Sequence, residues 1–106
     1  MNFRSKVLTQ SANGEACVGC GAMDGTVVWA HSNEQEHGKG AGIKAHDLLG
    51  NYLCFRCHQL YDGGTRAMKH NWFRAWYPIT MVRVAEKLAS GDLVLVAQQK
   101  RERASK

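Results

Sequence analysis

The sequence predicts a small α+β fold whose core is stabilised by a bound zinc ion. Two Cys-x-x-Cys pairs are separated by 33 residues, a pattern typical of four-thiolate zinc sites. A short segment rich in β-branched and aromatic residues lies between the pairs, and the last third of the chain has helical periodicity. A chain of 106 residues forms one domain with a modest core, which a metal ion can usefully reinforce.

Charge divides the chain into a neutral body and two basic ends. Residues 15–97 carry eight Lys and Arg against eight Asp and Glu, so the excess behind the formal net charge of +5 lies outside them. We expect a basic extension at residues 1–14, a single domain at 15–97 and a basic tail at 98–106. Basic ends attract nucleic-acid phosphates in a salt-dependent way, and they would serve solubility equally well.

The residue patterns predict a ββα unit at about residues 15–64. The segment Thr26–His31, rich in β-branched and aromatic residues, predicts one strand, and Leu48–Leu53 is the second, short predicted strand. The polar, glycine-rich segment 32–46 is the predicted loop between them. A turn at Cys54 leads into a helix that runs to about Tyr61.

The remainder of the domain, residues 65–97, is predicted to be mainly helical. Thr65 is the expected N-cap of a helix whose core stripe recurs every four residues: Met68, Trp72 and Trp76. Pro78 suits the first turn of a further helix that ends before Gly91. Residues 93–96 are expected to form a closing strand.

The cysteine pairs predict a structural metal site. Cys-x-x-Cys-His at residues 54–58 also matches the attachment motif of c-type haem. However, the chain has no apolar run long enough for a signal peptide or a membrane span, so we expect a cytoplasmic protein with no membrane partner. A reducing cytoplasm disfavours both covalent haem and disulfides. The predicted ligands of a closed, structural Zn²⁺ site are four thiolates: Cys17, Cys20, Cys54 and Cys57.

His58 suggests a second metal site. It lies at the start of the helix and is not needed as a ligand of the four-thiolate zinc site. Asp62 follows one helical turn later, so the two side chains share a face and could hold a harder cation such as Mg²⁺ or Mn²⁺. The alternative is that His58 packs beneath the zinc while Asp62 ends the helix. His31 favours the metal site, because a strand histidine opposite a helix histidine suits a one-metal nuclease with a histidine general base.

The same residues carry a resemblance to a known family. The matching blocks are Trp29–Asn33, Gly38–Asp47 and Cys54–His58 with Tyr61 and Asp62, in addition to the first cysteine pair. In these blocks the chain resembles the HNH or His-Me-finger endonucleases, and more closely the small nuclease-like proteins that phages and prophages encode. The resemblance implies a zinc-stabilised ββα-metal core, treble-clef-like, with C-terminal helices, in a bacterium or a phage-infected cell.

The resemblance also implies roles for individual residues. His31 corresponds to the general base and His58 to a ligand of the catalytic metal. Many HNH enzymes have a metal ligand directly before the base, where this chain has Ala30. Asp62 is therefore our expected second ligand, since some relatives use two ligands one helical turn apart.

For the middle residue of the H-N-H pattern, the usual spacing falls on Leu49, whose apolar side chain cannot take that role. Asp47 and Asn51 are the nearby polar candidates, and we favour Asp47 for orienting His31 or holding the loop. The expected nucleic-acid contacts are three basic residues: Lys39, Lys44 and Arg56. For the two lysines, a solvated loop without a binding role is the alternative.

The sequence thus predicts a metal-dependent endonuclease that hydrolyses DNA phosphodiesters with water as the nucleophile; RNA stays open as a substrate. A different class of function is a non-catalytic treble-clef zinc module that binds DNA or a protein. Ala30 favours that alternative, because it replaces a usual metal ligand.

Overall fold

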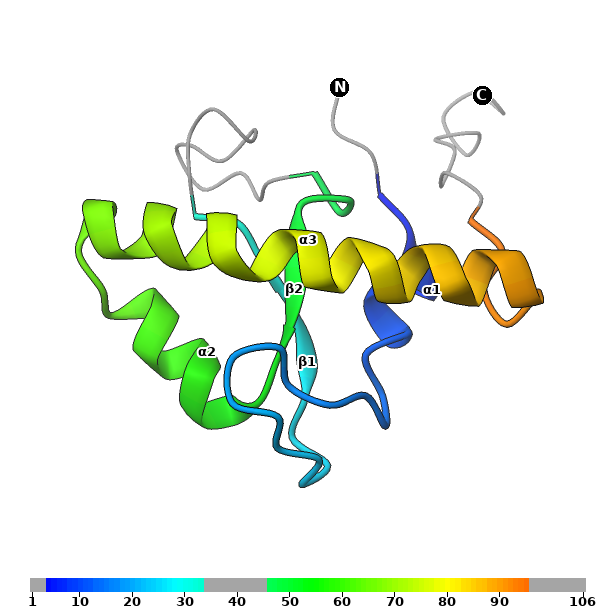
Figure 1. The fold of residues 1–106 in the computed structure, drawn as a ribbon, viewed down its shortest axis with the longest axis horizontal. Coiled ribbons are helices and arrows are strands. Elements are labelled where there is room, and N and C mark those ends of the chain that lie inside the picture. The colour runs from blue at the N-terminus through cyan, green and yellow to red at the C-terminus, as the bar shows by residue number, and fades with distance from the viewer. Residues whose placement is uncertain (1–3, 34–45, 96–106) are drawn as a thin grey trace, which may run out of the picture.

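The computed structural model describes residues 4–33 and 46–95. These residues form an α+β fold, as expected, with one antiparallel hairpin and three helices in the described part (Figure 1). The elements follow in chain order: α1 (Lys6–Gln10), β1 (Val28–His31), β2 (Gly50–Leu53), α2 (Phe55–Asp62) and α3 (Arg66–Ser90). The order β1-β2-α2 is the predicted ββα unit, with strands shorter than expected.

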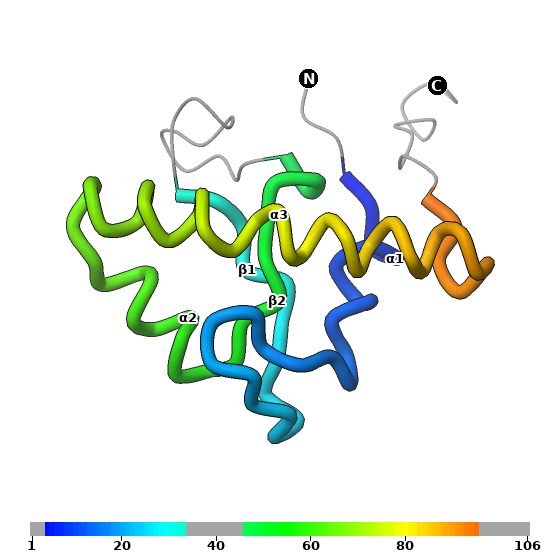
Figure 2. Tube along the Cα trace, in the orientation of Figure 1, coloured from blue at the N-terminus to red at the C-terminus, as the bar shows by residue number. Residues whose placement is uncertain are grey.

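The hairpin is buried on both faces, which is why all four residues of β2 are inaccessible to solvent. Trp29 pairs with Tyr52 on one face, and Ala30 pairs with Asn51 on the other, because successive side chains alternate across a sheet. On the first face the Tyr52 hydroxyl lies 2.9 Å from Ser11 Oγ, just after α1. On the second face Thr80 of α3 donates a 2.7 Å hydrogen bond to Asn51 Oδ1. Figure 2 follows this path of the chain, with α3 crossing the hairpin.

Helix α1 differs from the expected basic extension at residues 1–14. Ser5 caps the helix, with its hydroxyl accepting a hydrogen bond from Leu8 N at 3.2 Å. Leu8 and Ala12, one helical turn apart, are buried in the same hydrophobic cluster as the hairpin. This segment therefore belongs to the domain, and its two buried apolar residues do not form a pattern that stands out in a polar sequence.

Helix α3 is a single helix of 25 residues, so the predicted break at Pro78 is wrong. Its ends match the sequence: Thr65 Oγ1 accepts from Met68 N at 3.1 Å, and Gly91 stops the helix with φ at +85°. Aromatic side chains before Pro78 and buried residues after it hold both halves against the same core. Packing therefore outweighs the lost backbone hydrogen bond of one proline.

Two smaller expectations about the C-terminal third also change. Met68 is 42% exposed, so the core stripe consists of Trp72 and Trp76 without it. Leu93 is buried in the core, but residues 93–95 are not in a strand, and Val96 lies outside the described residues. Within the described ranges, no helix combines the length and the apolar character needed to cross a bilayer.

Candidate functional site

The four cysteines come together as expected. Their Sγ atoms all lie within 4.8 Å of one another, and Cys20 Sγ is 3.7 Å from Cys54 Sγ. Tetrahedral zinc with Zn–S bonds of about 2.3 Å requires sulfur–sulfur separations of about 3.8 Å. The cysteines are not joined as disulfides. Their arrangement thus fits a four-thiolate metal site, with zinc as the ion that suits it best.

Two short segments position these sulfurs. The first is the turn around Cys17, where Cys17 N donates to Ala22 O at 2.9 Å and Val18 N donates to Tyr52 O of β2 at 2.8 Å. The second is the start of α2, where Cys54 is the N-cap and Cys57 lies in the first turn. A side chain at Gly19 would put its Cβ 3.0 Å from Cys57 Sγ, so glycine permits the close approach of the two segments.

The thiols influence one another strongly. Burial acts to raise the pKa of Cys17, but backbone hydrogen bonds from Cys54, Cys20 and Gly19 outweigh it and lower the pKa to about 7. Burial, and then the hydrogen bond with Cys17, raise the pKa of Cys57. A divalent cation removes this conflict, because it holds every thiol of such a cluster as a thiolate.

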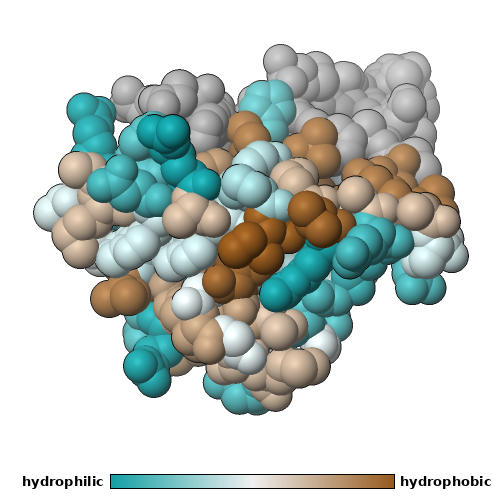
Figure 3. All heavy atoms as spheres, viewed as in Figure 1, coloured by the Kyte–Doolittle hydropathy of each residue, from teal (hydrophilic) through white to brown (hydrophobic). Residues whose placement is uncertain are grey.

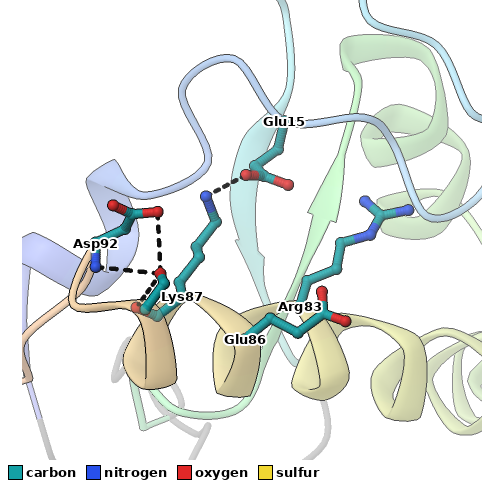
Figure 4. Close-up of a pocket in the computed structure, with 6 residues that line it drawn as sticks. Glu15, Arg83, Glu86, Lys87 and Asp92 are labelled. Atoms are coloured by element: carbon teal, nitrogen blue, oxygen red, sulfur yellow. Dashed lines mark hydrogen bonds and ion pairs between the residues drawn. The ribbon is translucent and has the colours of Figure 1, made fainter.

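The segment that leads into the cysteine turn is fastened to α3. Arg83 Nη1 donates to Ala16 O at 2.6 Å, and the Lys87 ammonium pairs with the Glu15 carboxylate. The hydrogen bond from Glu15 raises the pKa of Lys87. Figure 4 shows these side chains lining a hollow of about 420 Å³ near the end of α3. The charges there are of both signs, and Lys87 and Arg83 are both engaged with the segment at Glu15 and Ala16, so the contacts at this hollow hold that segment against α3.

A histidine–carboxylate pair lies at the end of β1. His31 Nε2 is 2.7 Å from Asp47 Oδ1, and the side chains are 20% and 7% exposed. An ionised carboxylate only accepts hydrogen bonds, so Nε2 carries the proton and Nδ1 is left as the acceptor nitrogen of the neutral ring. The imidazole is thus held in the tautomer that a general base needs.

Asp47 is itself held from three directions. Its Oδ2 accepts from Ser5 N at 2.5 Å, and Arg4 Nη1 lies 3.5 Å from Oδ1. Trp29 Nε1 donates to the backbone oxygen of Asp47 at 2.7 Å. The Trp29 ring reaches it by crossing Gly50, where any Cβ would lie 2.5 Å from Trp29 Nε1. The residue before α1 and a glycine in β2 therefore both support this carboxylate.

The second predicted metal pair lies on α2. His58 Nε2 is 3.3 Å from Asp62 Oδ2, and the side chains are 34% and 54% exposed. Asn33 Nδ2 donates to Asp62 Oδ1 at 3.0 Å, while Asn33 N donates to the Tyr61 hydroxyl at 3.1 Å. Because Asn33 follows His31 by two residues, the end of β1 and the last turn of α2 lie side by side.

Metal-ligating side chains are few at this second pair. In residues 4–33 and 46–95, the cysteines form the only group of three or more His, Cys, Asp or Glu side chains able to hold an ion. A cation at His58 and Asp62 would therefore keep water in most of its coordination positions, as Mg²⁺ commonly does. The Asp62 carboxylate and the remaining water ligands would suit Mn²⁺ as well as Mg²⁺.

The other candidate residues lie in different environments. Asn51 is buried and bonded to Thr80, away from His31, so Asp47 is the polar residue that contacts the histidine. Arg56 is exposed on α2, while Lys39 and Lys44 lie outside the described residues. Sequence reasoning gave no role to three residues that hold the pairs in place: Ser5, Trp29 and Asn33. Of these, Trp29 and Asn33 belong to one of the sequence blocks that carry the resemblance, and Ser5 does not.

Comparisons with protein-family models, with curated proteins and with solved structures found no match to this chain.

Proposed function

We propose that this protein is a metal-dependent endonuclease that hydrolyses DNA phosphodiester bonds. The observation that carries the proposal is the His31–Asp47 pair at the end of β1, which lies beside the turn of α2 that bears Asp62. One pair supplies a base for water and the other supplies ligands for a cation. This is the division of labour that single-metal phosphodiester hydrolysis requires.

His31 acts as the general base. With its Nε2–H donated to Asp47, Nδ1 takes a proton from water as the water oxygen bonds to phosphorus. The bond from phosphorus to the departing oxygen breaks, and that oxygen takes up a proton from solvent. Asp47 stabilises the imidazolium that forms, because a negative charge close by favours the protonated ring. A positioned base of this kind contributes roughly 10²–10⁴-fold in rate.

His58 and Asp62 are the ligands of the catalytic cation, and the Asn33 amide orients the Asp62 carboxylate. When bound, Mg²⁺ or Mn²⁺ supplies positive charge to the scissile phosphate and to the departing oxygen. The zinc site has a separate duty. It fixes the start of α2 against β2, so that the helix presents His58 and Asp62 at a set distance from β1.

Incubation of supercoiled plasmid with and without Mg²⁺ or Mn²⁺ tests this proposal. We expect cation-dependent nicking that His31→Ala abolishes without loss of zinc or of the thermal unfolding transition. Asp62→Asn should also abolish nicking at low Mg²⁺, with partial recovery as the Mg²⁺ concentration rises. Its matched control is Asp92→Asn, which changes an exposed aspartate that accepts a hydrogen bond from Ser90, and it should cleave normally. Unimpaired nicking by His31→Ala would end the proposal.

A second candidate is a zinc module that binds DNA or protein without cleaving it. The observation that favours it is Ala30, which is buried opposite Asn51 and offers no ligand atom where HNH enzymes commonly have one. In the plasmid experiment this candidate predicts tight binding with no nicking at any cation concentration. Cation-dependent nicking by the wild-type protein would decide against this candidate.

A further inference from the structure

We propose that one exposed face of α3, which bears Arg66 and Arg74, binds the phosphate backbone of duplex DNA. We call it the Arg66–Arg74 face. This inference rests on the proposed function for its choice of DNA, and it adds a substrate-binding surface in a part of the chain outside the ββα unit.

The segment from Gly63 to Ala85, which covers most of α3, carries charge of one sign. From Gly63 to Ala85 there is no Asp or Glu, whereas four cationic residues occur: Arg66, Lys69, Arg74 and Arg83. Arg83 is engaged with Ala16 O. Arg66 and Arg74 are exposed and form no ion pair with any residue in 4–33 or 46–95. Surfaces that serve only solubility usually mix both signs, so two exposed arginines without an acidic neighbour on the helix point to a polyanionic partner.

The spacing suits a regular row of phosphates. Arg66 and Arg74 are two i,i+4 steps apart, which places them about 80° apart around the helix, on adjoining stripes of one side. At 1.5 Å per residue their Cα atoms are about 12 Å apart along the axis. Each strand of duplex DNA carries one phosphate per about 3.4 Å of axis. The face therefore spans about three to four phosphates of one strand.

The position of the face links the two halves of the proposed active site. Its first residue, Arg66, follows Asp62 by four positions at the end of α2. At its other end, Tyr77 lies one turn beyond Arg74 and donates a 2.7 Å hydrogen bond to Leu48 O, next to Asp47. A strand that lies along this face thus runs from the His58–Asp62 pair towards the His31–Asp47 pair. Figure 3 shows strongly hydrophilic residues over this half of α3 and hydrophobic ones over its centre.

The aromatic residues of α3 argue for duplex rather than single-stranded DNA. Single-strand binders offer exposed rings on which bases stack. Here the rings pack on one another instead, with Trp72 on Trp76 at 5.8 Å and Phe73 on Tyr77 at 4.8 Å between centroids. The face therefore offers cations for phosphates without a stacking platform.

Salt-dependent binding of the zinc-loaded full chain to a labelled 20-base-pair duplex, without added Mg²⁺, tests the inference. The double variant Arg66→Gln/Arg74→Gln should lower the slope of log K against log [salt] by about 2, since each phosphate contact contributes about 0.9. At 0.1 M salt the affinity should then fall on the order of tens of fold, with the difference vanishing near 1 M. Glutamine keeps helix propensity, so α3 should stay folded.

The matched control removes one charge from another element. Lys6 is exposed on α1, so Lys6→Gln should change the slope far less than Arg74→Gln does. An unchanged slope in the double variant, an equal effect of Lys6→Gln, or equal affinity for single-stranded DNA, RNA or polyglutamate would overturn the inference. Binding through this face without nicking would sink the nuclease proposal alone, whereas nicking with an unaltered slope would sink the face alone.

Discussion

Asp47 is the residue through which the end of β1 and the start of α1 meet. Its Oδ1 faces His31, and its Oδ2 accepts from the backbone of Ser5. Replacement by asparagine keeps the size of the side chain but removes the charge that favours the imidazolium. We expect Asp47→Asn to lower the nicking rate roughly 10²–10⁴-fold, the range of a positioned general base. The measurement is single-turnover nicking of plasmid at saturating Mg²⁺.

Asn51 provides the control for Asp47. It is equally buried, but its partner is Thr80 of α3. Asn51→Ala should reduce the free energy of unfolding by about 1–3 kcal/mol, because the Thr80 hydroxyl loses its partner. Below the unfolding transition, its nicking rate should stay near that of the wild type. If Asn51→Ala lost activity as severely as Asp47→Asn while folded, Asn51 would have to be the middle residue of the motif.

The candidate site was only partly predictable at this scale. His31, His58 and Asp62 follow from local rules, since strand ends and i,i+4 spacing can be read along the sequence. The choice between Asp47 and Asn51 needed the register of the hairpin, which pairs His31 with Gly50 and turns Asn51 to the opposite face. Ser5 could not be found at all, because its contact with Asp47 spans 42 residues and uses only a backbone N–H.

Gly50 shows how one position in a strand supports the site. The Trp29 ring crosses it to reach the Asp47 carbonyl, and an added Cβ would meet that ring at 2.5–2.7 Å. We expect Gly50→Ala to cost about 1–3 kcal/mol of stability through overpacking. It should also slow nicking at temperatures where the domain remains folded, since the displaced indole no longer holds Asp47.

Thermal unfolding and nicking of Gly50→Ala are to be compared with Gly63→Ala. Gly63 follows α2, and a Cβ there would only approach Gln59 O at 3.4 Å, an ordinary contact. This control should therefore change both quantities little. Equal effects of the two substitutions would mean that Gly50 has no special relation to Trp29.

Pro78 marks the clearest limit of local prediction in this chain. A proline inside a helix lacks one backbone N–H and clashes with the carbonyl of Arg74, four residues earlier, so local rules favour a break. The break does not occur because Trp76 before Pro78 and Val84 after it pack on one core. Pro78→Ala should stabilise the domain by up to about 3 kcal/mol, measured by urea denaturation. An unchanged midpoint would mean that α3 carries no penalty at this position.

At the scale of the whole molecule, the fold class was predictable because the cysteines constrain it. Cys17, Cys20, Cys54 and Cys57 bring the first turn to the start of α2, which leaves room between them for little more than a hairpin. The covering of the hairpin was not predictable in the same way. Leu8 of α1 and Leu93 after α3 enter the core from the two ends of the chain, and no local pattern specifies such long-range packing.

Two metals with different duties should respond differently to chelation. The four-thiolate site is closed and would bind zinc with apparent energies of roughly 10–16 kcal/mol, comparable to the stability of a small domain. The His58–Asp62 pair is exposed and would keep its cation mostly hydrated. Brief EDTA treatment at pH 8 should therefore abolish nicking while the near-UV spectrum stays unchanged, and excess Mg²⁺ should restore activity.

Acid should remove the zinc instead. Protons compete with the metal for thiolates, so zinc affinity falls as the pH falls, and a chelator at pH 5 should release one zinc per chain together with unfolding. Cys54→Ser should fail to fold at any pH, because it leaves the cluster with three thiolates and α2 without its anchor. Zinc release that leaves the fold intact would contradict the scaffold role of the cysteines. The position of His58 and Asp62 would then need another explanation, since it is the cysteine cluster that joins the first turn of α2 to the turn around Cys17.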